Sequence, residues 1–319
     1  MRIAFASCMF NRVYDDQPVW DWIGQQTPDR LLLLGDSLYL DVAGAESHPQ
    51  DMGDDRFARH LFELYLELMA QPQFNNLVSS MPPGSVNAIW DDHDFLWNDA
   101  LGAETYPLHT EKVRLSTAFH EAFRTALGLG LAPGSFPPTH DDPRFWSAPR
   151  ALSTPSLQLA ADLWLHLSDG RTNRTRTFLL RESKRTLLGA AQRAQFGAVI
   201  QGAPAHSIHL WASGSTIAGY QPYARDLAWL ESVASTRRTL VLSGDIHRNR
   251  VDLFDTSGGF ALFEATSSGA AINDAVVIGD PLRNYGLVDI DAQSVTVQLF
   301  DHNVVQRTLT LDRPTWRPV

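Results

Sequence analysis

The sequence predicts an α/β protein with a sheet of short, buried central strands. Two observations predict this class. In the N-terminal part, short apolar runs alternate with segments whose apolar residues recur at helical spacing. Several of these runs stop abruptly at Gly-Asp or at a group of acids. Because the central strands of an α/β sheet are buried on both faces, they form unbroken apolar runs of this kind.

The N-terminal part gives the clearest alternation of strands and helices. Mostly apolar runs predict strands at Ile3–Ala6, Leu31–Leu34 and Ser85–Trp90. Apolar residues three and four positions apart predict helices at residues 18–26, 55–70 and 111–128. Residues Pro133–Pro149 are rich in Pro, Asp and Gly and predict a surface loop. This loop is the best candidate for a domain boundary, although an ordinary long loop explains it equally well.

Strands dominate the predicted C-terminal part. Alternating leucines predict one strand at residues 157–168, and "HSIHLWASG" and "RTLVLSGDIH" each predict a further strand. Residues 184–200 predict a helix. The tail from Leu287 to Leu311 alternates in two runs, "LVDIDAQSVTVQLF" and "VVQRTLTL", which predict strands at the edge of a sheet. No internal repeat or convincing linker interrupts the sequence, so a single domain is expected.

Composition excludes some classes of partner. With 319 residues, 44% of them hydrophobic, the chain can fill a sizeable core. Its formal net charge of −10 argues against a nucleic-acid groove, because gripping many phosphates needs a basic face. A local basic pocket for one phosphate stays compatible with this charge. No apolar stretch approaches the roughly 18 residues that span a bilayer, so there is no membrane signal.

Two features bear on the location of the protein. Cys8 is the sole cysteine, so no disulfide can form within the chain, which fits a reducing compartment. The N-terminus, "MRIAFASCMFNR", has an apolar run too short for a secretory signal. These features predict a cytoplasmic protein, although a leader that had been removed would not be visible in this sequence.

Acidic residues follow three of the predicted strands at the point where each strand ends. They are Gly35-Asp36, Asp91-Asp92-His93-Asp94 and Gly244-Asp245-Ile246-His247. Ligands in open α/β sheets collect beyond the carboxyl ends of the strands, so these side chains should converge. Crowded carboxylates would repel one another, and several would have to stay protonated. A metal cluster removes this conflict, because Asp oxygens and His nitrogens bind divalent and trivalent ions.

Simpler interpretations exist for each motif alone. A Gly-Asp pair after an apolar run is usually a turn, and Asp91 and Asp92 could cap the N-terminus of a helix. However, a solvated acidic run seldom has Ile89 and Trp90 directly before it and Phe95 directly after it. The joint occurrence of acids at three strand ends therefore favours the metal site.

Five motifs together give the sequence a family resemblance. In order, "FASC", "LGDSLY", "WDDHDFLWND", "LSDGR" and "LVLSGDIH" resemble motifs of the PhoD-like alkaline phosphatases, in the calcineurin-like metallophosphoesterase superfamily. The resemblance implies an αββα sandwich with a metal site at the C-terminal ends of the strands. It also implies one catalytic domain over residues 1–319, without the leader and the N-terminal β-rich domain of secreted members.

The resemblance implies a ferric ion and one or two calcium ions, and other divalent metals are compatible with the site. The implied iron ligands are Cys8, Asp36, Tyr39 and His247. Asp36 is also implied to bridge to a calcium ion held by Asp92 and Asp245. The residue chemistry agrees in part, because thiolate and phenolate favour trivalent iron and carboxylates suit calcium. The resemblance assigns Asp91, Asp94, Asn98 and Asp99 less specifically than these ligands.

The resemblance implies that three residues act on the substrate: His93, Asn98 and Arg171. His93 would face the phosphoryl group as a donor and not as a metal ligand, whereas Asn98 would steady the phosphoryl oxygens or bind calcium. Asp169 and Arg171 occupy the family's Asp-x-Arg position, with Gly170 as an unusual middle residue. Arg171 could hold a phosphoryl group in bidentate fashion, or it could form a structural salt bridge. Cys8 also has an alternative, since a lone cysteine is usually a small buried hydrophobe.

These expectations point to a metal-dependent hydrolase of phosphate mono- or diesters, with a metal-bound hydroxide as the attacking group. The expected partner is a small-molecule phosphoester, and loops such as Ala45–Asp55 and Pro133–Pro149 would set the substrate preference. Alternatives on the same site are a phosphodiesterase, a phosphotriesterase or a catalytically silent calcium-binding relative. A protein with acidic caps and no metal is a further alternative. The histidines that fit no ligand spacing are His109, His120, His140, His206 and His209. His166, at the end of a predicted strand, is expected to be packed or exposed to solvent and not functional.

Overall fold

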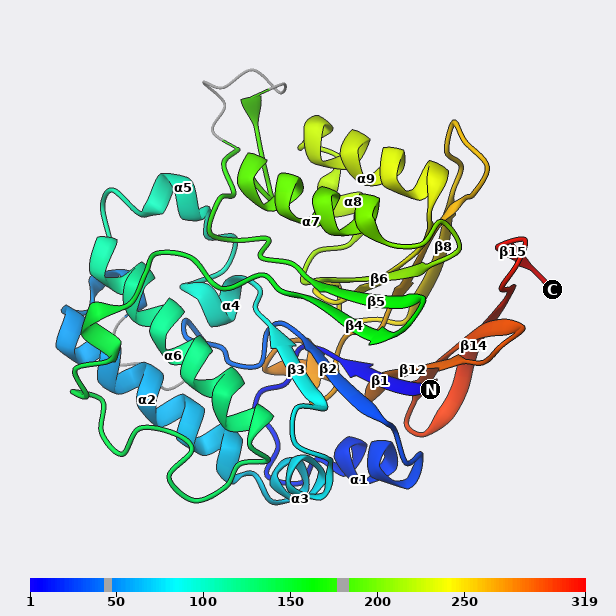
Figure 1. Ribbon diagram of the computed structural model, residues 1–319. Helices are drawn as coiled ribbons and strands as arrows, with labels where there is room; N and C mark the ends of the chain where they lie inside the picture. Colours follow the sequence, from blue (N-terminus) through cyan, green and yellow to red (C-terminus); the bar gives the residue numbers. More distant parts are fainter. Residues whose placement is uncertain (43–47, 177–183) are drawn as a thin grey trace.

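Two β-sheets packed face to face form the centre of the molecule, and helices cover both outer faces (Figure 1). The computed structural model describes residues 1–42, 48–176 and 184–319. This αββα sandwich confirms the predicted fold class. No helix within these described ranges is long and apolar enough to cross a membrane.

The first sheet combines both ends of the chain. Its parallel strands are β1 (Arg2–Ala6), β2 (Arg30–Leu34) and β3 (Val86–Ile89). The C-terminal strands β12 (Asn284–Ile290), β13 (Ser294–Asp301), β14 (Val304–Asp312) and β15 (Arg317–Pro318) extend it antiparallel from β1, in the order β15-β14-β13-β12-β1-β2-β3. The prediction that the tail forms paired strands is therefore confirmed, but its edge placement holds only in part. β14 and the short β15 lie at the edge, whereas β12 and β13 lie inside the sheet. The first tail run forms two strands, because Asp291 accepts hydrogen bonds from the backbone of Gln293 and Ser294 and closes a turn.

The second sheet has the order β4-β5-β6-β7-β9-β8. Its strands are β4 (Ser156–Ala160), β5 (Leu163–Leu167), β6 (Ile208–Ser213), β7 (Arg238–Ser243), β8 (Arg250–Phe254) and β9 (Leu262–Thr266). The prediction of one strand at residues 157–168 is wrong, since β4 and β5 form an antiparallel pair with a turn at Ala161 and Asp162. The alternating pattern has the same period on both sides of the turn, so it hides the reversal.

Aliphatic side chains of both sheets fill the space between them. Phe5 and Leu34 of the first sheet belong to the same buried cluster as Leu165 and Leu242 of the second. Burial of this kind contributes roughly 1.5–3 kcal/mol for each large apolar side chain. Because the strands are buried on both faces, they need the unbroken apolar runs seen in the sequence.

Among the described residues, four helices cover the outer face of the first sheet and three cover that of the second (Figure 1). The first group is α1 (Pro18–Gln25), α2 (Asp54–Ala70), α3 (Pro72–Ser80) and α6 (Thr110–Gly128), and the second is α7 (Ala190–Gly202), α8 (Ile217–Tyr220) and α9 (Ala224–Thr236). The prediction that a helix begins at residue 184 is wrong. Asp226 accepts the backbone N–H groups of Leu187 and Leu188, and Gly189 has a φ of +80°, so the helix begins only at Ala190.

Short elements complete the fold. They are the 3₁₀ helices Pro49–Asp51 and Phe145–Ser147, the helices α4 (Asp92–Phe95) and α5 (Gly102–Thr105), and the strand pair β10 (Ile272–Ala275) and β11 (Ile278–Leu282). Of these, α4 directly follows β3 and carries the acidic motif. The sequence patterns did not predict α3, α9 or the strands β8 to β11.

Candidate metal centre

The backbone is strained where the strands end. Cys8, Asp36, Asp245 and His247 all have positive φ angles, of 57°, 50°, 78° and 50°. A left-handed conformation costs a non-glycine residue roughly 1–2 kcal/mol, and such residues gather at active sites and ligand clamps. Four of the six predicted metal ligands therefore sit in a conformation that the surrounding structure has to stabilise.

Two glycines let these strand ends approach each other. Gly35 has a φ of +97°, and a Cβ atom there would lie 2.6 Å from the backbone nitrogen of Asp91. A Cβ atom on Gly214, which follows β6, would lie 2.7 Å from the carboxyl carbon of Asp91. Only residues without a side chain fit at these two places. The loops after β2, β3 and β6 can therefore close around Asp91.

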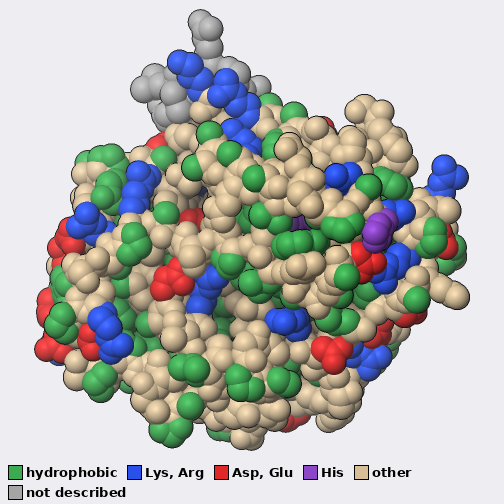
Figure 2. All heavy atoms as spheres, viewed as in Figure 1, with side chains coloured by type: hydrophobic (Ala, Val, Ile, Leu, Met, Phe, Trp, Pro, Cys, Tyr) green, Lys and Arg blue, Asp and Glu red, His purple; other side chains and the backbone are tan. Residues whose placement is uncertain are grey.

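Four carboxylates converge where β2, β3 and β7 end. Ligand oxygens of Asp36, Asp91, Asp92 and Asp245 lie within 4.8 Å of one another, and an overlapping group within the same limit contains Asp36, Asp92 and His93. Three of these carboxylates are buried, and Asp245 is the more open one. Figure 2 shows other acidic and basic side chains scattered over the visible face of the molecule. The predicted convergence of the three strand ends is thus observed.

Crowding and burial perturb these carboxyl groups strongly. Loss of water, followed by repulsion from the neighbouring thiol and acids, raises the pKa of Asp36 well above its ordinary value. The same two causes, burial and repulsion from Asp91 and Asp92, raise the pKa of Asp245 to about 7. Burial is also the largest single influence on Asp92, but the attraction of Arg171 and His93 and the hydrogen bond from Asp99 together outweigh it, so the pKa of Asp92 is lowered. Without a cation, part of the cluster would therefore stay protonated near neutral pH.

Buried oxygen atoms that accept no hydrogen bond test whether the cluster fits a metal. They are Asp36 Oδ1, Asp91 Oδ2 and Asp92 Oδ1, of which Asp92 Oδ1 forms an ion pair with Arg171 at 3.2 Å. Buried polar groups are nearly always satisfied, so such atoms call for an explanation. Hard cations such as calcium bind several carboxylate oxygens at once. The donor set therefore fits a divalent or trivalent cation.

The predicted thiolate, phenolate and imidazole ligands lie beside the carboxylates. Cys8 Sγ is 3.4 Å from Asp36 Oδ2, and the Tyr39 hydroxyl is 3.3 Å from His247 Nε2. Cys8 and Tyr39 belong to a small buried apolar cluster with Phe10. Burial raises the pKa of Cys8 to about 11 and raises that of Tyr39 well above its ordinary value. Both groups are neutral in this environment, so either could act as an anionic ligand only beside a cation.

Ser268 connects the two sides of this ligand set, and the sequence motifs did not reveal it. Its hydroxyl donates to Cys8 Sγ at 3.1 Å and accepts the backbone N–H of His247 at 2.9 Å. The side chain of Asn284 donates to the Ser268 carbonyl at 2.6 Å. These bonds fix Cys8 and His247 relative to each other.

Asp41 holds the ring of His93 and is a second residue that the motifs missed. Asp41 Oδ1 lies 2.6 Å from His93 Nδ1, and the ring of Tyr39 lies 4.3 Å from the imidazole. Burial disfavours the charged imidazole, but Asp41 and then Asp36 outweigh it and raise the pKa of His93 to about 9. Asp41 lies two residues after the motif "LGDSLY", and this position is the signal that could have identified it. His93 is therefore oriented by Asp41, and its charged form is favoured beside the carboxylate cluster.

The other residues of the acidic motif lie around the cluster. Asp94 accepts the backbone N–H groups of Ser37 and Leu38 at 2.7 and 3.0 Å, so it ties the loop after β2 to the loop after β3. Asn98 has an exposed side chain, and its backbone N–H donates to Asp41 Oδ2 at 2.7 Å. Asp99 donates its backbone N–H to Asp92 Oδ2 at 2.7 Å. Asp94 is thus a structural carboxylate, and Asn98 and Asp99 position Asp41 and Asp92.

Arg171 pairs with the carboxylates. Its Nε lies 2.5 Å from Asp91 Oδ1 and its Nη2 lies 3.2 Å from Asp92 Oδ1, and the residue is 2% exposed. Asp169 accepts the indole N–H of Trp90 and the backbone N–H of Arg171, which fixes the loop that carries Arg171. These contacts favour the salt-bridge alternative for Arg171 over direct contact with a phosphoryl group.

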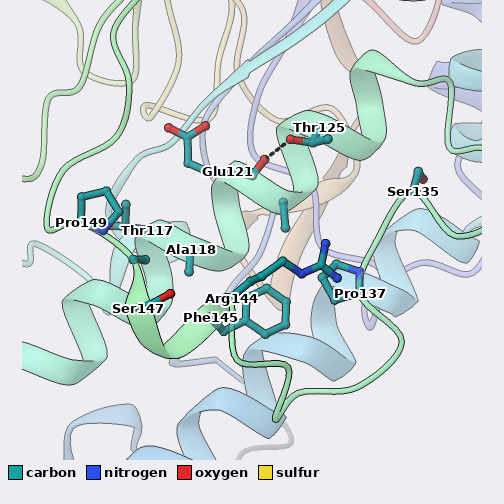
Figure 3. A pocket seen from close by; sticks show the side chains of 12 residues that line it. Thr117, Ala118, Glu121, Thr125, Ser135, Pro137, Arg144, Phe145, Ser147 and Pro149 are labelled. Carbon is teal, nitrogen blue, oxygen red and sulfur yellow. Dashed lines mark hydrogen bonds between the residues drawn. The ribbon is translucent and has the colours of Figure 1, made fainter.

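The loop Pro133–Pro149 borders a different hollow. Figure 3 shows a pocket of about 440 Å³ between this loop and α6, with Glu121 on the helix and Arg144 and Phe145 on the loop. None of the candidate metal ligands lines it. The expectation that this loop sets substrate preference therefore gains no support from its position. Of the other such loop, Ala45–Asp55, residues 45–47 lie outside the described residues.

The histidines without ligand spacing lie elsewhere within the described chain. His166 and His209 are buried partners whose ring nitrogens are 2.9 Å apart, and burial lowers the pKa of His166 to about 3. His120 is buried against the hydroxyl of Tyr65. Of the two environments expected for His166, packed or exposed to solvent, the structure shows the packed one.

Comparison with known proteins adds evidence on the fold. No protein-family profile matches the sequence, and no curated protein matches it. Among solved structures, the structure of PhoD is similar over 100% of this chain and 71% of its own, with a TM-score of 0.70 and 14% identity. Vps29 with Zn²⁺ from Entamoeba histolytica matches over 98% of this chain and 99% of its own at 10% identity, but with a TM-score of only 0.35.

The two packed sheets with helices on both outer faces define an αββα sandwich whose acidic cluster lies where β2, β3 and β7 end. This chain shares its fold with the structure of PhoD.

Proposed function

We propose that this protein is a metal-dependent phosphoester hydrolase that acts on phosphate mono- or diesters. The observation that carries the proposal is the cluster of Asp36, Asp91, Asp92 and Asp245, with three buried oxygens that accept no hydrogen bond. Such a cluster is hard to stabilise without cations. The PhoD-like fold supports the same class of chemistry.

The ligand chemistry supports two kinds of metal position. Cys8, Tyr39 and His247 would hold a ferric ion together with Asp36, and Asp36 would be shared with a calcium position formed by Asp92 and Asp245. Asp91 joins the proposed calcium side, since its oxygen lies in the same group. When bound, such ions supply Lewis-acid charge to the phosphoryl oxygens and lower the pKa of water.

His93 is the residue that would act on the substrate. Its Nδ1 is held by Asp41, so Nε2 is left to donate a hydrogen bond to a phosphoryl oxygen. A charged donor placed before the reaction stabilises negative charge that develops in the transition state. It could also give a proton to the leaving oxygen. Asn98 would contribute through its exposed amide or through its backbone contact with Asp41.

Arg171 would support the site without touching the substrate. Its single positive charge offsets part of the negative charge of Asp91 and Asp92, and bound cations would balance the rest of the cluster. Arg174 is also occupied, because its guanidinium donates to Gly170 and Ser215. The second negative charge of a monoester would therefore depend on His93, and we expect diesters to be hydrolysed at least as well as monoesters.

A parallel assay of metal content and hydrolysis tests the proposal. The protein would be purified with iron and calcium supplied and assayed with p-nitrophenyl phosphate and bis(p-nitrophenyl) phosphate. We expect bound metal, turnover of at least one ester, and loss of turnover on chelation. Bound metal with no turnover of any ester would favour the silent calcium-binding alternative. A metal-free, folded and inactive protein would overturn the proposal.

A further inference from the structure

A second pocket adjoins the candidate metal centre on the side of His247. It has a volume of about 200 Å³, and His247, Arg248, Gln306 and Arg307 are among the residues that line it. The imidazole of His247 is shared by the two sites, because its Nε2 lies 3.3 Å from the Tyr39 hydroxyl. A substrate bound at the metal centre could therefore extend past His247 into this arginine pocket.

The charge of the arginine pocket differs from that of the whole chain. Arg248 and Arg307 have exposed side chains, and neither forms an ion pair with any described residue. Asp301 also lines the pocket, and its Oδ1 lies 2.6 Å from Nδ1 of His302. In a chain of net charge −10, two arginines without carboxylate partners form a local attraction for anions.

A β-bulge in the first sheet determines where Arg307 lies. The register of β13 and β14 shifts between Leu299 and Phe300, since Leu299 pairs with Arg307 and Phe300 pairs with Val305. Gln306 is the extra residue, and neighbouring strand residues would otherwise face opposite sides of the sheet. The bulge allows both Gln306 and Arg307 to line one pocket.

The loop that carries Arg248 is held firmly. The Asn249 side chain donates to the Phe300 carbonyl at 2.8 Å and to the Asn284 side chain at 3.2 Å, and it accepts from Ser267 at 3.0 Å. Asn284 in turn donates to the Ser268 carbonyl, next to Cys8 and His247. The hydrogen bonds that hold the base of the arginine pocket therefore connect with those that hold Cys8 and His247.

We propose that the arginine pocket binds a second anionic group, a phosphoryl or carboxylate group, of the same substrate whose phosphoester lies at the metal centre. This inference rests on the proposed function and specifies its substrate class. Arginine suits this role because its planar guanidinium pairs with both kinds of anion. The preferred substrate is then a phosphoester that carries a separate anion.

A matched pair of substrates tests the proposal kinetically. Thymidine 5′-(p-nitrophenyl phosphate) would be compared with the same compound carrying a 3′-phosphate, so that only the second anion differs. We expect wild-type protein to favour the 3′-phosphorylated compound in kcat/KM by roughly tenfold, as two exposed ion pairs would give. The double substitution Arg248→Ala/Arg307→Ala should bring the ratio of the two kcat/KM values close to one, and Arg248→Lys/Arg307→Lys should restore part of it.

Arg317→Ala is the matched control, since Arg317 is an exposed arginine on β15 that does not line the pocket. It should leave the ratio at the wild-type value. If Arg317→Ala lowers the ratio as much as the double substitution does, the preference depends on total charge and not on the pocket. This result would overturn the proposal. A wild-type ratio near one, or a ratio unchanged in the double variant, would also overturn it.

A binding measurement separates this proposal from the proposed function. Calorimetry would compare thymidine 3′,5′-bisphosphate with thymidine 5′-monophosphate on the purified protein and on the double variant. The arginine pocket is supported if the bisphosphate binds more tightly than the monophosphate to wild-type protein but not to the double variant. This result supports the pocket even if neither ester is hydrolysed. Equal binding of the two nucleotides to wild-type protein would contradict it even if both esters are hydrolysed.

Discussion

The carboxylate of Asp41 lies 2.6 Å from Nδ1 of His93, so a residue from the loop after β2 orients the imidazole at the start of α4. This contact connects the segment that follows Asp36 with the motif that contains His93. Neither of the two residues in the contact is a predicted metal ligand. It leaves Nε2 of His93 as the nitrogen available to a substrate. Two substitutions separate the role of the ring from that of its support.

His93→Ala should lower kcat by about a hundredfold, because it removes a charged donor from the transition state. Asp41→Asn should have a smaller effect in the same direction, since the ring remains but loses its anionic partner. Metal content should stay close to that of the wild type in both variants, and elemental analysis beside kcat checks this. Loss of metal in His93→Ala would show that His93 is a ligand, which its closeness to Asp36 and Asp92 allows.

Asp36→Asn should reduce turnover by at least about a thousandfold while the protein stays folded. Asp36 contacts Cys8 and also belongs to the carboxylate group, so loss of its charge weakens both proposed metal positions. Circular dichroism would confirm the fold, and iron and calcium would be measured in the same samples. Turnover near the wild-type level with full metal occupancy would exclude the bridging role.

Arg171→Met should destabilise the protein most strongly when metals are removed. The substitution leaves the buried carboxylates of Asp91 and Asp92 without their cation, a loss that is typically about 3–5 kcal/mol. Denaturant unfolding in EDTA measures the change in the free energy of unfolding, and added calcium should recover part of it. An unchanged free energy of unfolding together with a large rise in KM would instead indicate direct contact with the substrate.

Glu264 should make stability depend on pH. It is buried in β9, accepts the backbone N–H of Ile217 at 2.8 Å, and has its pKa raised by burial from 4.5 to about 7. The folded state binds this proton more tightly, so the stabilising contribution is complete below pH 4.5 and is lost as the pH rises through 7. Glu264→Gln should remove this dependence. The difference in unfolding free energy between variant and wild type should change by up to roughly 3 kcal/mol in favour of the variant.

Urea unfolding of both proteins at pH 5 and pH 8 measures the Glu264 effect. Because the two proteins share the same metal centre, effects of pH on metal binding cancel in the comparison. If the difference in unfolding free energy between Glu264→Gln and wild type is the same at pH 5 and pH 8, Glu264 does not titrate as described.

Cys8 should determine both iron binding and colour. A thiolate and the Tyr39 phenolate on ferric iron would give visible charge-transfer absorption. Cys8→Ser should shift that absorption and weaken iron binding, whereas Cys8→Ala should lose iron and keep calcium. If Cys8 were only a buried hydrophobe, Cys8→Ala would lower stability by roughly 1 kcal/mol and leave iron and colour unchanged. Visible spectra with iron analysis of the three proteins decide between these roles.

The strands whose ends carry the acids could be predicted because each is buried on both faces. Leu31–Leu34 formed an unbroken run that stopped at Gly35-Asp36, and the structure confirms both the strand and its acidic end. By contrast, the hairpin at Ala161 and Asp162 could not be seen, since alternation has the same period in both of its strands.

The supporting residues of the site could not be predicted for a different reason. The side chains of Ser268 and Asp41 each make two hydrogen bonds to residues distant in sequence. Such bonds leave no periodic pattern, and only the position of Asp41 close to a motif gave a signal. The sequence motif identified Arg171. Whether its guanidinium contacts a phosphoryl group or Asp91 depends on burial, which only the folded structure shows.

The most direct test of the account is the metal content of the purified, folded protein. Elemental analysis of wild-type protein expressed with iron and calcium supplied should find about one iron and at least one calcium per chain, and EDTA should lower the melting temperature. A colourless, iron-free protein that still holds calcium or zinc would contradict the ferric position alone. A folded protein with no bound metal and a melting temperature unchanged by EDTA would contradict the account as a whole.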